Sequence, residues 1–240
     1  MACPPCYNSN IFLWDVILLN SSKKTVLRQW LRIIIGLVIF AFGVHLTIFA
    51  NIGLAPWDCL SMGVSYHTPL NYGMSVTVIS LLIICIDLLM KERIGFGTLL
   101  DALIVGNTIQ FFNDVNPLPL NEGLLTGIPI MLLGFVFMAV GQWRYMSGAQ
   151  CCGPRDMLLV GLGKRLPKVP IGVVQISLLA VVVFVSWLLG GPVGIGTLVS
   201  VLGMGLVMQL VLNVVHFEPR SVTNRDCVEV IRILAERETP

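Results

Sequence analysis

The sequence reads Ala55-Pro56-Trp57-Asp58 at one place and Gly153-Pro154-Arg155-Asp156 at another. In each motif a small residue precedes a proline, and an aspartate follows the proline two positions later. Proline suits the first position of a helix, because its ring fixes φ and its missing N–H would have no helical partner there. An aspartate in the first turn is favoured by the positive end of the helix dipole. Each motif therefore predicts the start of a helix, one at Pro56 and one at Pro154.

The composition around these motifs is that of an integral membrane protein. Of the 240 residues, 56% are hydrophobic and only 12% are charged, and residues 169–217 contain no Asp, Glu, Lys or Arg. Non-helical backbone and carboxylates are tolerated inside a membrane where they line a cavity or lie within the protein. Because non-helical segments, 51–54 and 150–152, are expected directly before the two motifs, we expect the functional centre at these motifs.

Several classes of function have no support in the sequence. The chain has no Walker motif, no GxSxG and no nucleotide-binding fingerprint. Its seven cysteines do not form a disulfide framework, and its three histidines lie far apart in the sequence, so that no metal-ligand spacing arises. We therefore expect no enzyme activity, no cofactor, no metal and no nucleic-acid partner.

The two motifs belong to a duplication of the whole chain. The motif prolines are 98 positions apart (154 − 56), and further along the offset becomes 99. Glycine, aspartate and glutamine keep this register, which chance similarity between apolar segments would not produce. The pairs are Gly36 and Gly134, Gly43 and Gly141, Asp58 and Asp156, Gly63 and Gly161, Gly106 and Gly205, and Gln110 and Gln209.

The predicted fold is an all-α membrane protein made of two tandem homologous halves. Each half has three spanning helices and one short helix that begins at its motif. The spans are expected at about 27–49, 74–90, 96–112, 124–143, 171–189 and 197–215, and the short helices at 56–66 and 154–162. The domain boundaries are an N-terminal extension at 1–22, a first repeat at 23–113, a linker at 114–123, a second repeat at 124–217 and a cytoplasmic tail at 218–240.

The short helices leave two topologies open. If each one enters the membrane and returns on the same side, the halves are inverted repeats; if each one spans, there are eight spans and the repeats are parallel. With the basic N-terminus inside, the inverted arrangement puts the other basic loops inside and the segments 113–123 and 190–194, which contain no Lys or Arg, outside. The inverted, re-entrant arrangement fits the charges better.

Inverted short helices would direct their N-terminal N–H groups and dipoles at one central region. We expect a substrate site there made of Pro56, Trp57, Asp58, Pro154, Arg155, Asp156, Gln110 and Gln209. Arg155 would bind a carboxylate or phosphate of a solute, or pair with Asp58 or Asp156. The two aspartates would carry protons or serve as helix caps. Asn107 and His45 are further lining candidates, whereas Asp87 and Asp101 are expected to be solvated near the cytoplasmic ends.

The two motifs and the segments Gly95–Leu99 and Gly194–Leu198 resemble the YczE-like bacterial membrane proteins, which are related to the YitT group. The resemblance covers about residues 27–225 and implies a multi-pass protein of the bacterial inner membrane; with the basic N-terminus inside, both termini are expected in the cytoplasm. The expected function is a secondary transporter or channel for a small polar or anionic solute. The alternative is a membrane scaffold that transports nothing. The expected partners are the lipid bilayer and the solute, and a homodimer is left open.

Overall fold

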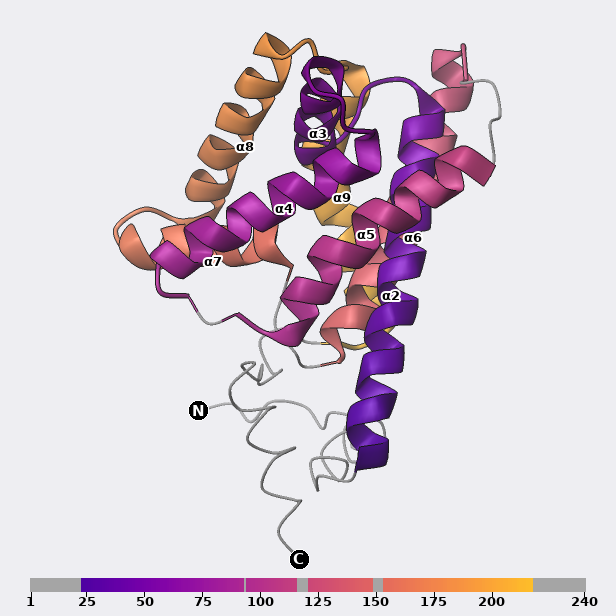
Figure 1. Cartoon of the computed structure of the whole chain (residues 1–240). Helices are drawn as coiled ribbons and strands as arrows, with labels where there is room; N and C mark the ends of the chain where they lie inside the picture. Colours follow the sequence, from indigo (N-terminus) through magenta and orange to yellow (C-terminus); the bar gives the residue numbers. More distant parts are fainter. Residues whose placement is uncertain (1–22, 93, 116–120, 149–152, 218–240) are drawn as a thin grey trace, which may run out of the picture.

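The structure is a computed structural model that describes residues 23–92, 94–115, 121–148 and 153–217. The described residues form eight helices and no strand (Figure 1). They are α2 (Lys23–Ala50), α3 (Pro56–His67), α4 (Tyr72–Leu89), α5 (Phe96–Val115), α6 (Leu124–Met146), α7 (Pro154–Arg165), α8 (Ile171–Leu188) and α9 (Ile195–Val214). The predicted all-α class is confirmed. The N-terminal extension and the tail from residue 218 lie outside the described residues.

Five of the described helices are long and apolar enough to cross a membrane. They contain the spans 28–50, 72–89, 124–146, 171–188 and 195–214. Helix α5 has 20 residues but is not among the five, and it carries the polar residues Asp101, Asn107, Gln110, Asn113 and Asp114. That α5 also spans the membrane stays a prediction.

Helices α2 and α6 form the centre of the molecule and pack closely along their lengths. A Cβ added to Gly36 would lie 2.8 Å from the carbonyl oxygen of Gly141, and one added to Gly43 would lie 2.7 Å from that of Gly134. The four glycines therefore let the two backbones approach each other, as small residues do at helix interfaces in membranes. The close neighbour of Gly36 and Gly43 is therefore α6.

The buried side chains around this pair make up the main core. Phe135, Met131, Leu37 and Ile33 are completely buried, and residues of α4 and α5 pack against the same cluster. The outer helices α8 and α9 instead show most of their apolar side chains at the surface, Leu198, Leu202 and Leu206 among them. In a membrane protein such a surface faces lipid, so α2 and α6 position the interior while α8 and α9 lie at its edge.

The segment before α3 is non-helical, as predicted, and its backbone is hydrogen-bonded to the start of α9. The carbonyl oxygen of Ile52 accepts a hydrogen bond of 2.7 Å from the N–H of Gly196. Gly53 has a φ of 114°, and its Cβ position would lie 2.9 Å from the nitrogen of Gly194, so only glycine fits here. The polar backbone of this segment is thereby satisfied inside the protein, as membrane burial requires.

Candidate functional site

Both short helices begin where the sequence predicted. Helix α3 starts at Pro56 after Ala55, and α7 starts at Pro154 after Gly153; both preceding residues have extended backbone. The proline stands at the first helical position in each case, where its missing N–H is not needed. Asp58 and Asp156 fall in the first turn of their helices. Helix α3 ends at His67 and α7 at Arg165, a little beyond the ends expected from the sequence.

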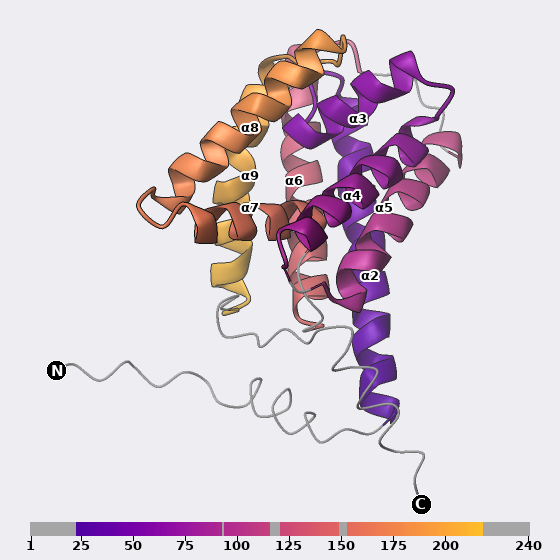
Figure 2. The same cartoon turned by 60° about the vertical axis from the view of Figure 1, so that its left-hand side comes forward.

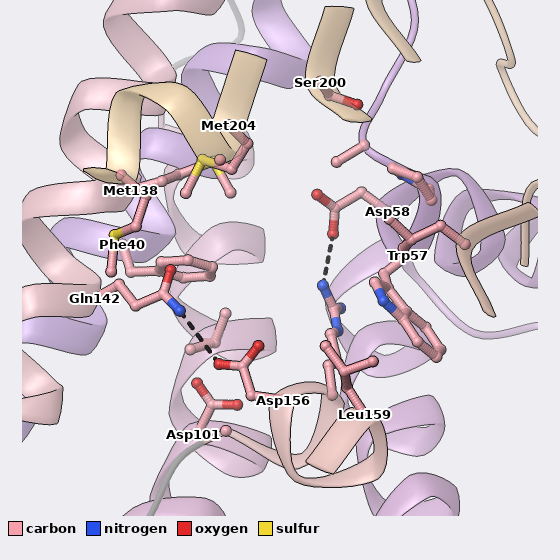
Figure 3. A pocket seen from close by; sticks show the side chains of 18 of the residues that line it. Phe40, Trp57, Asp58, Asp101, Met138, Gln142, Asp156, Leu159, Ser200 and Met204 are labelled. Atoms are coloured by element: carbon pink, nitrogen blue, oxygen red, sulfur yellow. Dashed lines mark hydrogen bonds and ion pairs between the residues drawn. The ribbon is translucent and has the colours of Figure 1, made fainter. Parts of the chain in front are cut away.

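The two helix starts open on a single cavity of about 320 Å³ between the two halves of the chain (Figure 3). Its walls combine charged, amide and hydroxyl groups with a larger number of apolar side chains. The polar and charged lining residues are Asp58, Ser80, Asp101, Gln142, Tyr145, Arg155, Asp156, Gln175 and Ser200. The aromatic and sulfur-containing lining residues are Phe40, Trp57, Met138, Met204 and Met208. Apolar walls with a few polar groups are typical of a site for a small molecule.

An ion pair joins the two motifs across the cavity. The guanidinium Nη1 of Arg155 donates a hydrogen bond of 3.3 Å to Oδ1 of Asp58, and Arg155 Cζ lies 5.8 Å from the centre of the Trp57 ring. The Asp58 side chain is 2% exposed and that of Arg155 is 23% exposed. The pairing that the sequence left open for Arg155 is therefore made with the aspartate of the other half.

The second oxygen of Asp58 has no such partner. Oδ2 is buried and makes no geometrically defined hydrogen bond among the described residues, but the hydroxyl group of Tyr72, which is also buried, lies close enough to interact with this carboxyl group. In Figure 3 this oxygen lies on the side of the carboxyl group away from Arg155. The Tyr72 hydroxyl group can donate to this carboxyl group, which lowers the cost of burying it.

Asp156 lies lower in the same cavity, beside two groups from α5 and α6. Its Oδ2 accepts a hydrogen bond of 3.2 Å from Nε2 of Gln142, and the carboxyl group of Asp101 lies next to it in Figure 3. The hydroxyl oxygen of Tyr145 accepts a hydrogen bond of 2.9 Å from the N–H of Gly153, directly before α7. These contacts fix the start of α7 against α6 and bring two carboxyl groups together.

The structure brings together five of the eight predicted site residues. Pro56, Trp57, Asp58, Arg155 and Asp156 line the cavity. Pro154 begins α7 but is buried and does not line the cavity.

Gln110 and Gln209 are also absent from the cavity lining. Oε1 of Gln110 accepts from the N–H of Gly73, and its Nε2 donates to Asp114, while Gln209 is exposed on α9. Asn107 and His45 likewise lie off the cavity, because His45 bonds Asn113 at 2.6 Å and Asn107 bonds the carbonyl of Leu103. Periodicity marked these groups as intramembrane polar residues but did not show which way they face.

Two acidic residues that the sequence assigned to solvated helix ends lie elsewhere. Asp101 lines the cavity, and Asp87 is completely buried, with no hydrogen-bond partner for either oxygen among the described residues. Both expectations of solvation were wrong. The reason is that α4 and α5 continue past these residues and pack against α7, so that the ends are covered by protein.

The sequence missed several lining residues, of which Gln142 and Tyr145 are the most polar. Gln142 stands in a span of otherwise apolar residues, and an amide at such a place is a signal for a buried polar contact. No comparable signal marks Phe40, Met138 or Met204, which resemble ordinary core residues. Among the described residues, the cavity lining carries three carboxyl groups and one guanidinium group. No cluster of metal-ligating side chains occurs in the described part of the chain.

Comparison with known proteins gives the family. Residues 27–213 match a family described as "Family of unknown function (DUF6198)". The uncharacterized membrane protein YczE of Bacillus subtilis is 30% identical over 192 residues, which cover 79% of this chain and 88% of the relative. The chain belongs to this family. The resemblance to YczE-like membrane proteins is thereby confirmed.

Two further relatives agree with this assignment. An uncharacterized protein of Haemophilus influenzae is 30% identical over 183 residues, 76% of this chain and 83% of the relative. The uncharacterized protein YyaS of Bacillus subtilis is 29% identical over 188 residues, 76% of this chain and 92% of the relative. No solved structure matches the chain. The match begins at residue 27 and ends at 213, so it contains both motifs and all the residues that line the cavity.

Proposed function

We propose that this protein is a secondary transporter or channel for a small polar solute, which binds in the cavity between the two helix starts. One observation carries the proposal: the cavity is walled by equivalent positions of the two halves. At the offset of 98, Trp57 corresponds to Arg155 and Asp58 to Asp156, and all four line the cavity. A central site at the interface of two repeats is characteristic of secondary transporters.

The equivalence extends to the helices on either side of the motifs. Further equivalent pairs that line the cavity are Phe40 and Met138, Val76 and Gln175, Ser80 and Leu179, Asp101 and Ser200, and Val105 and Met204. The chemistry within most pairs differs, so the site is symmetric in position and asymmetric in its charges and hydrogen-bonding groups. A scaffold would need no cavity of this kind, which is why transport is preferred to the scaffold alternative.

We further propose that the halves are inverted repeats and that α3 and α7 are re-entrant. Each has 12 residues and is therefore about 18 Å long, whereas the hydrocarbon core of a bilayer is about 30 Å thick. In Figure 1 and Figure 2, α3 lies near the end of the bundle at which α2 finishes, and α7 lies farther towards the other end. The distribution of basic residues supports both termini in the cytoplasm, and the resemblance to YczE-like proteins supports a location in a bacterial inner membrane.

A single cysteine tests the inverted topology. Leu70 lies between α3 and α4, and the inverted arrangement places it outside. A Leu70→Cys variant on a background without native cysteines would then react with a membrane-impermeant maleimide added to intact cells. Labelling only after the cytoplasmic side has been opened would contradict the inverted arrangement.

Ligand-dependent thermal stability tests the site. A compound that binds only the folded protein stabilises it by about 2.7 kcal/mol at 100 times its Kd, so a panel of metabolites and ions at two pH values should raise the unfolding midpoint for the correct class. The increase should be lost in Asp156→Asn but kept in Asn107→Ala, a matched polar residue off the cavity. Uptake of that compound into proteoliposomes should show the same pattern. Binding without any uptake would favour a non-transporting protein.

A further inference from the structure

The charges in the cavity disfavour an anion. Asp58, Asp101 and Asp156 line it, and Arg155 is the one basic side chain in the described lining. That guanidinium already donates to Asp58 Oδ1 and lies over the Trp57 ring. An anionic solute would have to displace Asp58 from Arg155 and then lie near two further carboxyl groups. Like charges that share one small cavity repel each other strongly in a medium of low dielectric constant.

The same groups provide acceptors for a cation. Asp58 is 2% exposed and already lies beside Arg155 and the Tyr72 hydroxyl group, and Asp101 and Asp156 also line the cavity. The neighbouring carboxyl groups of Asp101 and Asp156 face the same space in Figure 3. Ammonium and guanidinium groups donate charge-assisted hydrogen bonds to carboxylates, and these bonds are about twice as strong as neutral ones.

The rest of the wall indicates an organic cation and not a metal ion. Phe40, Met138, Met204, Met208 and Leu178 surround the carboxyl groups, and a volume of about 320 Å³ is at the small end of ligand sites. The described residues contain no group with metal-ligand geometry. Methionine and aromatic side chains adapt to an apolar body and attract a cation.

We infer that the cavity selects a small organic cation, an amine or guanidinium with an apolar body of modest size. This inference rests on the proposed function, because it assigns a substrate class to the same site. Protons compete with the cation for the carboxyl groups, so binding should weaken as the pH falls. The titratable and charged groups that face one another here are Asp58, Asp101, Asp156, Arg155, Tyr72 and Tyr145.

Three compounds of one shape and different charge test the substrate class. Cyclohexylamine, cyclohexanol and cyclohexanecarboxylate share an apolar ring and are titrated by calorimetry into the purified full-length protein. We expect the amine to bind at least about tenfold more tightly than the alcohol, and Asp101→Asn or Asp156→Asn to weaken it by about tenfold or more. Asn107→Ala should bind the amine with unchanged affinity. A signal that is the same in this variant and in the cavity variants would come from partition of the compound into detergent.

The outcomes separate this inference from the proposed function. Preference for the carboxylate, lost in Arg155→Gln, would overturn the cation class and leave a transporter for anions standing. Equal binding of all three compounds, unchanged in every cavity variant, would overturn the site itself and with it the proposed function. Preference for the amine that depends on Asp101 and Asp156 supports both.

A second inference rests on a separate observation, the packing of α4 on α5. A Cβ added to Gly73 would lie 2.4 Å from the carbonyl oxygen of Gly106, and the reverse distance is also 2.4 Å. Gly73 N–H donates to Gln110 Oε1 at 3.1 Å. Two glycines in backbone contact and one amide therefore hold these helices together, a known way to join helices in a membrane.

The equivalent residues of the second half make none of these contacts. At the offset of 99, Gly73 corresponds to Gly172, Gly106 to Gly205 and Gln110 to Gln209. A Cβ added to Gly172 or to Gly205 would meet no atom within 4 Å, and all three residues are exposed. Helices α8 and α9 are therefore separated at the positions that are equivalent to the packed positions of α4 and α5.

The rest of the packing is matched between the halves. Helix α2 packs on α5 as α6 packs on α9, and α3 packs on α8 as α7 packs on α4. The difference is therefore confined to the α8–α9 hairpin, whose connection contains Gly190 with a φ of 66°. The central cavity extends into the gap, since Gly205, Leu179 and Val201 line it, and the last two also line an apolar groove between α8 and α9.

We infer that the protein has a second conformation in which α8 closes on α9 through Gly172, Gly205 and Gln209, while α4 opens from α5. The pair α8–α9 would then be packed and the pair α4–α5 would be open. The cavity would be closed on the opposite side. Inverted repeats are suited to such an exchange, because each half can adopt the conformation of the other. The equilibrium between the two states is what a bound solute would shift.

Two matched pairs of spin labels test this inference in the full-length protein in lipid nanodiscs. Labels at Val169 and Val214 report the α8–α9 gap, and labels at Leu70 and Val115 occupy the equivalent positions of α4–α5. We expect a short and a long distance for each pair, with populations that change in opposite directions. Gly172→Leu with Gly205→Leu should remove the short distance between 169 and 214 without lowering the unfolding midpoint, because both sites are open in the observed state.

Two results would overturn the exchange. One is a single long distance for 169–214 at pH 5 and pH 8, with and without cyclohexylamine. The other is a short distance that also arises between molecules carrying one label each, since the gap would then be filled by a second copy of the chain.

Discussion

The ion pair between Arg155 and Asp58 yields the most quantitative prediction, tested by removing each partner alone and both together. The two charges are 3.3 Å apart, so their attraction is about 5 kcal/mol at an effective dielectric constant near 20. Part of it offsets the cost of burying Asp58, which is 2% exposed. We therefore expect Arg155→Gln to cost about 3 kcal/mol and Asp58→Asn about 2 kcal/mol, since each leaves a buried partner unpaired.

The double variant Asp58→Asn/Arg155→Gln should cost about as much as Arg155→Gln alone, because both substitutions break the same pair. This gives a coupling energy of about 2 kcal/mol, or about 4–8 °C in the unfolding midpoint for a chain of this size. The assay is thermal unfolding of the purified protein in detergent. The matched control is Glu92→Gln with Lys164→Gln, whose bridge also joins the two halves but has Lys164 62% exposed; its coupling should be below about 1 kcal/mol.

The same ion pair also predicts how the destabilisation by each substitution changes with pH. In Arg155→Gln, the buried charge of Asp58 has no counterion, and a proton taken up at low pH removes that charge. The destabilisation by Arg155→Gln should therefore shrink as the pH falls, whereas that of Asp58→Asn should not grow. Additive effects of the two substitutions, within about 0.5 kcal/mol, would refute the reasoning, because the pair would then contribute nothing that depends on both members.

Four further substitutions have defined outcomes in the same unfolding assay. Gly141→Ala places a Cβ 2.5 Å from the backbone nitrogen of Phe40 and should cost about 1–3 kcal/mol, whereas Gly172→Ala enters open space and should leave the midpoint unchanged; equal effects would contradict the α2–α6 packing. Asp87→Leu removes two buried oxygens that lack partners in the described chain and should raise the midpoint by a few degrees, so a fall would reveal a partner for this carboxyl group. Tyr145→Phe removes the hydroxyl that accepts from Gly153 N–H and should cost about 1 kcal/mol; an unchanged midpoint would mean that this bond does not hold α7.

Local sequence was most informative where a residue acts on its own backbone. Pro56 and Pro154 begin helices because the proline ring fixes φ at its own position, whatever surrounds it. Gly36 and Gly43 are seven residues apart and therefore share one helix face, so a close neighbour could be predicted. The repeat spacing identified Gly134 and Gly141 as counterparts of Gly36 and Gly43. It did not show that the two pairs would lie opposite each other.

Side-chain direction was the information that the sequence lacked. Gln110 and Gln209 are equivalent in the repeat, yet one bonds Gly73 and the other is exposed, and neither lines the cavity. Asp101 was assigned to solvent because it lies near the start of its helix, but it lines the cavity next to Asp156. These outcomes depend on how helices rotate and tilt against each other, which residues far apart in the chain decide together.

The sequence alone thus predicted an all-α membrane protein, the starts of α3 and α7, and the family, because these follow from local geometry, hydropathy and the two motifs. Tertiary structure decided that Arg155 pairs with Asp58, 97 positions away, and that three carboxyl groups share one cavity with one guanidinium. It also decided that the glycines of one half are in contact while those of the other half are open. Two segments of similar sequence can pack differently, because packing depends on the partner surface and on the conformational state as well as on the segment itself.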